Sequence, residues 1–158
     1  MSLRPFKAQF PTNPKEGDEV LIRGTLKEHA RCFSVNFCLP RPTEVPPHVS
    51  PPYIAYHFKT IYEDQGDGKV IQNFKNLEWH AKEKVSDNIW HTNRNEAFTV
   101  IFRLHEEKIK VFGNDIQHNP DYEYELTMPL EEIDTIELWD DVKEVKEIRF
   151  CYDKRNAC

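Results

Sequence analysis

The most constraining feature of the sequence is a strict alternation of apolar and polar side chains in residues 32–39, Cys-Phe-Ser-Val-Asn-Phe-Cys-Leu. Every second residue from Phe33 to Leu39 is large and apolar, and Ser34 and Asn36 fall between them. A period of two places the apolar side chains on one face of an extended strand, whereas a helix needs a period near 3.6 residues. The segment therefore predicts an antiparallel strand with one face on a hydrophobic core and one polar face.

The same alternation recurs in three later segments, 98–104, 109–111 and 133–138. It is less regular in 142–148, where a change of phase predicts a β-bulge. Residues that tolerate positive φ angles separate these segments, at 17–18, 66–68, 93–95 and 113–115. Helical patterns are weak, and they are limited to a turn or two in 77–86 and 127–133. Short strands with frequent turns predict an all-β fold, an antiparallel two-sheet β-sandwich or jelly roll.

Length and charge narrow the class of protein. A chain of 158 residues fits one domain, 1–158, which we expect to end in a short flexible tail at 152–158. The net charge of −6 argues against a nucleic-acid-binding protein, which needs a basic face. No apolar run approaches the ~20 residues of a transmembrane segment. The N-terminal residues lack the hydrophobic core of a signal peptide, so we expect a cytoplasmic protein or one exported by a non-classical route.

The four cysteines predict free thiols. Cys32 and Cys38 lie six residues apart on one predicted strand, which separates them by ~20 Å at ~3.4 Å per residue. A disulfide needs Cα atoms within ~7 Å, so this pair cannot form one. Cys151 and Cys158 lack the Cys-x-x-Cys spacing. Four free thiols would favour a reducing compartment.

One proline-rich segment interrupts the strands. Residues 39–53 contain six of the eleven prolines, which cannot donate to a sheet ladder. We expect a stiff loop over 40–52 that connects two strands. The alternative is a polyproline ligand for a partner domain.

An ordered series of short motifs between about residues 10 and 150 resembles the galectin family. The segments that carry the resemblance are GDEVLIRG at 17–24, FSVNF at 33–37, IAYHF at 54–58, VIQN at 70–73, FTVIF at 98–102, MPL at 128–130 and IDTIEL at 133–138. Each motif alone is weak, but their order and spacing together are specific. The resemblance implies a single galectin-like carbohydrate-recognition domain that binds β-galactosides in a shallow groove on one sheet.

Other expectations follow from the same resemblance. The partners would be glycans or glycoproteins, no metal or cofactor would be used, and two copies would pair through exposed edge strands. The proline-rich loop would lie at one end of the groove.

The sugar-binding motif of the family is only partly present. It places His-x-Asn-Pro-Arg on one strand, Asn on the next and Trp-Gly-x-Glu-x-Arg after it. His57, Asn73 and Trp79 match its His, second Asn and Trp. Lys59 and Ile61 stand where the motif has Asn and Arg. The aromatic platform and two hydrogen-bonding side chains are therefore kept, whereas the arginine of the first strand is lost.

The third part of the motif departs further. His80 stands for Gly, Lys82 for Glu and Lys84 for Arg. The predicted carbohydrate-binding residues are His57, Lys59, Asn73, Trp79, Lys82 and Lys84. The three lysines are either solvated surface charges or a positive patch that attracts anionic ligands. Trp90 and Trp139 are predicted to be packing residues.

These patterns predict a non-catalytic lectin with altered or weakened β-galactoside specificity, directed toward acidic glycans. The alternative is a protein-interaction module that has kept the fold and lost sugar binding. Motifs of serine hydrolases, P-loop nucleotide-binding proteins and zinc peptidases do not occur in the sequence. We therefore expect no enzymatic activity.

Overall fold

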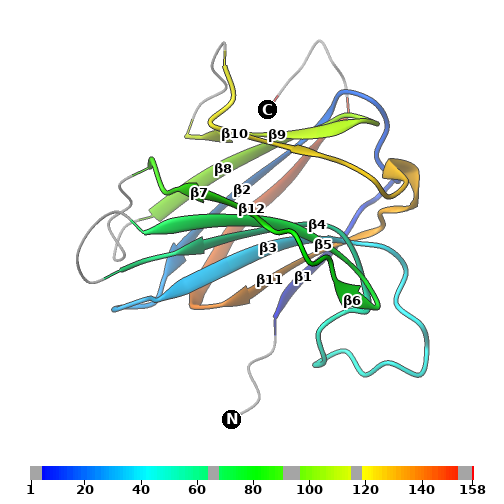
Figure 1. Cartoon of the computed structure of the whole chain (residues 1–158), viewed down its shortest axis with the longest axis horizontal. Helices are drawn as coiled ribbons and strands as arrows, with labels where there is room; N and C mark the ends of the chain where they lie inside the picture. Colours follow the sequence, from blue (N-terminus) through cyan, green and yellow to red (C-terminus); the bar gives the residue numbers. More distant parts are fainter. Residues whose placement is uncertain (1–4, 64–67, 91–96, 115–118, 153–157) are drawn as a thin grey trace.

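The computed structural model describes residues 5–63, 68–90, 97–114, 119–152 and 158, and it forms two antiparallel sheets packed face to face (Figure 1). The strands of the larger sheet are β1 (Phe6–Gln9), β3 (Cys32–Cys38), β4 (Tyr53–Ile61), β5 (Lys69–Asn76), β6 (Glu78–Trp79), β7 (Lys84–Asp87) and β11 (Thr135–Asp140). The strands of the smaller sheet are β2 (Asp18–Leu26), β8 (Ala97–Leu104), β9 (Lys108–Gly113), β10 (Tyr122–Glu125) and β12 (Val142–Cys151). The predicted all-β sandwich is confirmed.

The order of strands differs from their order in the chain. The seven-stranded sheet runs β1-β11-β3-β4-β5-β6, with β7 also paired to β5, and the five-stranded sheet runs β10-β9-β8-β2-β12. Strand β11 thus lies beside β3, although about a hundred residues separate them along the chain. The position of β11 beside β3 determines which side chains line the main cavity of the protein.

The core lies between the two sheets and follows the predicted alternation. Phe33, Val35 and Phe37 of β3 are buried, and Phe102 of β8 contacts Phe37 edge to face across the core. The outer face of β3 differs from the expectation, because its polar side chains are buried as well. Asn36 is only 2% exposed, and its amide is satisfied by hydrogen bonds inside the protein.

The irregular strand and the turn at Gly17 lie where the sequence predicts them. Strand β12 pairs with β2 through two register shifts, between Val142 and Glu144 and between Val145 and Glu147, which confirms the bulge. Gly17 and Gly68 have φ angles of 87° and 81°, as their turns require. The predicted turn residues 66–67, 93–95 and 115 lie outside the described residues.

One of the two weak helical segments is helical. The 3-10 helix Leu130–Glu132 lies within 127–133, whereas 77–86 forms β6 and β7 instead of a helix. Both of these short strands pair with β5, and the sheet thereby outweighs the weak local preference. Within the described part of the chain, no helix has the length and apolar character needed to cross a bilayer.

The proline-rich loop is held against the seven-stranded sheet, beside β6 (Figure 1). Arg41 Nη1 donates to the carbonyl oxygens of Pro46 and Val49, each at 2.8 Å, and so closes the loop on itself. Lys7 of β1 donates to the Pro47 carbonyl at 2.7 Å. These contacts are typical of a rigid connection.

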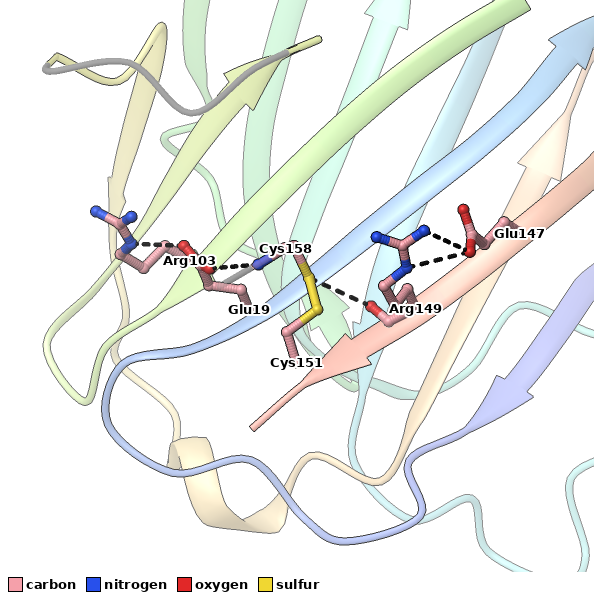
Figure 2. Close-up of a disulfide and its surroundings, with 6 residues drawn as sticks. All are labelled: Glu19, Arg103, Glu147, Arg149, Cys151 and Cys158. Carbon is pink, nitrogen blue, oxygen red and sulfur yellow. Dashed lines mark hydrogen bonds and ion pairs between the residues drawn. A yellow bond between two sulfur atoms is a disulfide. The ribbon is translucent and has the colours of Figure 1, made fainter. Parts of the chain in front are cut away.

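The prediction of four free thiols is wrong for one pair. Cys32 and Cys38 are free, as expected, but Cys151 and Cys158 form a disulfide with Cα atoms 5.7 Å apart (Figure 2). The chain returns to the sheet after β12, and the Cys158 backbone N–H donates to Glu19 Oε1 at 3.1 Å. Seven residues are enough for this return, so the absence of Cys-x-x-Cys spacing did not exclude the pair. The cysteines therefore give no support to a reducing compartment.

The end of the chain is anchored at Cys158 and at Tyr152. Besides the disulfide at Cys158, the Tyr152 hydroxyl donates to the Thr12 carbonyl at 2.6 Å. Residues 153–157 of the predicted flexible tail lie outside the described residues.

Candidate functional site

A cavity of about 490 Å³ opens on the outer face of the seven-stranded sheet. It is lined by side chains from β3, β4, β5, β6 and β11 and by Ser50 and Pro51 of the proline-rich loop. Four of the six predicted site residues line it: His57, Lys59, Asn73 and Trp79. The proline-rich loop thus borders the cavity, which the resemblance led us to expect for one end of the groove.

Two rows of outward side chains, set by the strand register, form most of the floor. In the first row Asn36 pairs with His57 and His57 with Asn73, and Glu137 of β11, which pairs with Asn36, lies beyond the cavity lining. In the second row Trp139 pairs with Ser34, Ser34 with Lys59, and Lys59 with Ile71. Paired residues of neighbouring strands share a face, so each row is continuous across the sheet.

His57 is neutral and its tautomer is fixed by Asn36. The Asn36 Nδ2 group donates to Ser34 Oγ at 3.0 Å, so its Oδ1 atom is the acceptor that lies 2.6 Å from His57 Nδ1. Nδ1 therefore carries the proton, and Nε2 is left as a hydrogen-bond acceptor. Burial, with Lys59 and Lys75 nearby, lowers the pKa of His57 from 6.5 to about 4.

Trp79 provides an aromatic surface beside this histidine. Its side chain is 43% exposed, and its ring centroid lies 4.5 Å from that of His57. Lys75 Nζ lies 5.3 Å from the indole centroid and donates to Ser50 Oγ at 3.2 Å. The Trp79 ring is therefore partly open to solvent within the cavity.

Asn73 is committed mainly to the local backbone. It is 4% exposed, its Nδ2 donates to the His80 carbonyl at 3.1 Å, and its Oδ1 accepts from the Phe74 N–H at 2.9 Å. These bonds hold the turn between β5 and β6, and so hold Trp79 beside His57. One amide hydrogen of Asn73 remains to serve a ligand.

The other two predicted lysines do not line the cavity. Lys84 pairs with Gln72, whose side chain is buried between the sheets, and Lys84 Nζ donates to the Glu123 carbonyl of β10 at 2.8 Å. Lys82 is exposed beyond the cavity lining. Among the described residues, Lys59 is thus the lysine that lines the cavity and Lys75 lies near Trp79 and His57, while Glu83 and Asp140 add negative charge to the lining.

Trp139 is a cavity residue that sequence reasoning assigned to packing. It lines the cavity from β11, whereas Trp90 packs on Phe58 and Tyr122 as expected. The signal was present, since Glu137 and Trp139 alternate with buried Ile136 and Leu138. What the sequence did not provide was the position of β11 beside β3.

A buried carboxylate organises this end of the cavity. Glu137 is 2% exposed, and Arg41 Nη2 donates to its Oε2 at 3.0 Å while Trp139 Nε1 donates to its Oε1 at 2.9 Å. Lys7 Nζ lies 3.9 Å from Oε2. One carboxylate therefore joins the proline-rich loop, β1 and the Trp139 indole.

Asp140 closes the same end with an unusual backbone. Its φ angle is 77°, in the left-handed region that most residues other than glycine, asparagine and aspartate avoid. The neighbouring Asp141 holds this turn, because its Oδ2 accepts from the backbone N–H groups of Arg31 and Cys32 at 2.8 and 3.2 Å.

Known proteins are similar to this chain in sequence and in fold. The model of the galactoside-binding lectin family matches residues 5–150. Rat galectin-4 is 26% identical over 92% of this chain, and mouse galectin-6 is 27% identical over 92%. The matched regions make up 41% and 44% of those two proteins, so this chain spans less than half of their length.

Solved structures share the fold at low sequence identity. Sheep galectin-11 in complex with glycerol has a TM-score of 0.71 at 17% identity, covering 94% of this chain and 98% of that one. Toad ovary galectin in complex with thio-digalactose has a TM-score of 0.71 at 18% identity, with the same shares covered. Xenopus laevis galectin-Ib has a TM-score of 0.70 at 20% identity over 92% of this chain and 98% of that one.

Proposed function

The chain belongs to the galactoside-binding lectin family, and from that premise we propose that it binds glycans without catalysis, with weak affinity for simple β-galactosides. The observation that carries the proposal is the pairing of Trp79 with a neutral His57 in one cavity. An exposed indole accepts the apolar face of a sugar ring. The free Nε2 of His57 accepts a hydroxyl proton, so stacking and directional bonding meet at one place.

Weak galactoside affinity is expected from the altered motif. Lys59 and Ile61 replace the Asn and Arg of β4, and Lys82 and Lys84 lie outside the cavity. A site that binds at 0.1 mM has a binding free energy of about 5.5 kcal/mol. Each hydrogen bond to a charged group contributes roughly 1.5–3 kcal/mol, so losing two or three removes most of that affinity.

An acidic saccharide is the preferred ligand in this proposal. Lys59 and Lys75 both lower the pKa of His57, which indicates a positive potential at the imidazole. Among the described residues, Lys59 pairs with no carboxylate, so its ammonium group can meet a sialate or sulfate. Glu83 and Asp140 also line the cavity, so the anion should bind near Lys59 and away from these two carboxylates.

The test compares lactose with 3′-sialyllactose by calorimetric titration at low and high salt. We expect millimolar or weaker binding of lactose and tighter, salt-sensitive binding of the sialylated sugar. Trp79→Ala should remove both. Lys59→Ala should reduce binding of sialyllactose and flatten its salt dependence, whereas the matched control Lys146→Ala, an exposed lysine of β12, should not.

The two excluded lysines belong in the same series. Lys82→Ala and Lys84→Ala should each have a smaller effect than Lys59→Ala, because neither side chain lines the cavity. An effect equal to or larger than that of Lys59→Ala would show that Lys82 and Lys84 belong to the binding site.

The competing function is a protein-interaction module on the same fold. Its support is the lost Arg and Glu positions together with the proline-rich loop. Absence of binding to every neutral and acidic glycan at low salt would overturn our proposal in its favour. Pairing of two copies through edge strands, and a cytoplasmic location with non-classical export, stay predictions.

A further inference from the structure

The outer face of the five-stranded sheet carries large apolar side chains where polar ones are expected. Phe112 of β9 pairs with Ile101 of β8, and Ile101 pairs with Leu21 of β2, so these side chains form one row across the sheet. Val100 and Phe102, which flank Ile101, belong to the core between the sheets, so the row lies on the opposite, outward face. The outward face of an antiparallel sheet usually meets water, so this apolar row needs a cover.

The row is covered in the folded chain. Leu21, Ile101 and Phe112 are only 8%, 2% and 1% exposed. Cys158 packs against them, and the Arg103 guanidinium lies 5.2 Å from the centre of the Phe112 ring. Cys158 is therefore part of the cover, although it follows the last strand of the sheet in sequence.

We propose that the Cys151–Cys158 disulfide is a reducible latch, which holds Cys158 over the apolar row, and that its reduction uncovers the row without unfolding the domain. The latch lies on the outer face of the five-stranded sheet, whereas the cavity opens on the seven-stranded sheet. The inference therefore goes beyond glycan binding and does not depend on it.

The disulfide is the covalent part of this attachment (Figure 2). Besides it, the Cys158 backbone N–H donates to Glu19 Oε1 at 3.1 Å, and the Cys158 Sγ atom lies 3.9 Å from the Arg149 carbonyl oxygen. Keeping Cys158 in place closes a loop after Tyr152, which costs chain entropy. The hydrogen bond and the packing of one small side chain offset this cost only in part, so we expect Cys158 to leave once the covalent bond is broken.

Release of Cys158 leaves no charge of this site buried without a partner. Glu19 is 3% exposed, and its Oε2 atom still accepts from Arg103 Nε at 2.8 Å. The end of β12 also stays attached, because the Tyr152 hydroxyl donates to the Thr12 carbonyl at 2.6 Å. The change is thus local to Cys158 and the row that it covers.

The opening reaction is a thiol–disulfide exchange with an external dithiol. Both cysteines are partly exposed, so the bond is accessible to a thiolate. The thiolate attacks one sulfur atom and releases the other cysteine, which takes up a proton. The second thiol of the reductant then displaces the mixed disulfide. The dithiol is oxidised to a disulfide, and Cys151 and Cys158 become thiols.

The test reduces the full chain with dithiothreitol and follows the fluorescence of anilinonaphthalene sulfonate, a dye that binds exposed apolar surface. Mass spectrometry after alkylation verifies that the disulfide is reduced, and the readout is the increase on reduction, so that dye bound elsewhere cancels. We expect a several-fold increase with an unchanged near-UV circular dichroism spectrum. The double variant Cys151→Ser with Cys158→Ser should bind the dye without reductant and should not respond to it.

A matched variant removes the apolar row and keeps the latch. Leu21→Thr with Ile101→Thr makes two outward positions polar with residues suited to strands, so reduction should leave its dye fluorescence unchanged. An increase in this variant would place the uncovered surface elsewhere and refute the latch. The near-UV spectrum of the variant controls for its fold.

Three results with the native chain would also overturn the proposal. Complete reduction without an increase in dye fluorescence would show that the row stays covered. Loss of the near-UV spectrum on reduction would show that the disulfide holds the whole domain together. Resistance of the disulfide to dithiothreitol in the folded chain would show that the bond is not reducible in place.

Discussion

The two ends of the cavity differ in how their side chains are held. At the β6 end, His57 is fixed by one neutral partner, Asn36, and Trp79 is 43% exposed. At the β11 end, Trp139 is fixed by Glu137, which is 2% exposed and also binds Arg41. The end that resembles the family motif is therefore the one without a charged network, and the other end has a network of its own.

This difference indicates that the rigid part of the binding surface is at the β11 end. A buried carboxylate with two charge-assisted partners keeps a fixed geometry, because moving it leaves a desolvated charge unpaired. The β6 end relies on burial of His57 and on the turn that Asn73 holds. Four experiments test how far the two ends differ.

The largest effect is expected at Glu137. Glu137→Ala removes a buried charge from Arg41 and the acceptor from Trp139, and we expect it to lower the free energy of unfolding by about 3–5 kcal/mol. Urea denaturation measures this change. Glu131→Ala, an exposed carboxylate in the preceding turn, is the matched control and should change it by less than about 0.5 kcal/mol. A small effect at Glu137 would show that the β11 end is not rigid.

Low pH should destabilise the protein through the β6 end of the cavity, where His57 becomes protonated. Its pKa is about 4 in the folded chain against 6.5 in the unfolded chain, so the unfolded state binds more protons between these values. The free energy of unfolding should therefore fall as pH drops from 6.5 toward 4, by at most about 3 kcal/mol from this residue. The drop should be smaller in His57→Gln. Equal pH profiles of the two proteins would contradict the low pKa.

Removal of the disulfide should leave both ends of the cavity unchanged. Cys151 and Cys158 lie at the five-stranded sheet, and closure of so short a loop stabilises by roughly 2 kcal/mol in the chain-entropy model. The double variant Cys151→Ser with Cys158→Ser should lose about this much stability and bind sialyllactose as the native chain does. A change in affinity would show that the two sheets are coupled.

The smallest effect is expected when residues of the family motif are restored at the β6 end. Lys59 and Ile61 follow His57 at alternate positions of β4, so both can be returned to the residues of the family motif. Lys59→Asn with Ile61→Arg should raise lactose affinity about tenfold, or about 1.4 kcal/mol. Titration of lactose measures the gain, and Ile61→Lys with Lys59→Asn controls for charge without the planar arginine group. An unchanged lactose affinity would indicate that this end is blocked for another reason.

The core was predictable because a period of two is a local property of the sequence. Phe33, Val35 and Phe37 are buried as the alternation requires, and no long-range knowledge was needed. His57 and Trp79 were predictable for a different reason, since their flanking residues match a known motif. The fold and the β6 end of the cavity could thus be predicted from short stretches of sequence.

The positions of the remaining site residues could not be predicted, because they depend on contacts between residues that are distant in the sequence. Trp139 lines the cavity only because β11 pairs with β3, and Lys84 leaves it only because β7 pairs with β5 in a register opposite Gln72. The disulfide at Cys158 likewise required the chain to turn back on β12. Side-chain alternation defines the two faces of a strand, but the face that meets a cavity is set by the neighbouring strands.

The left-handed backbone at Asp140 restricts how this cavity can change during evolution. Glycine and asparagine adopt a φ angle of 77° at least as easily as aspartate, so most other substitutions at this position should strain the turn. The two tolerated replacements both remove the negative charge and leave the shape of the turn in place. Either replacement should therefore make this corner less repulsive to an anionic ligand while the backbone of the turn is kept.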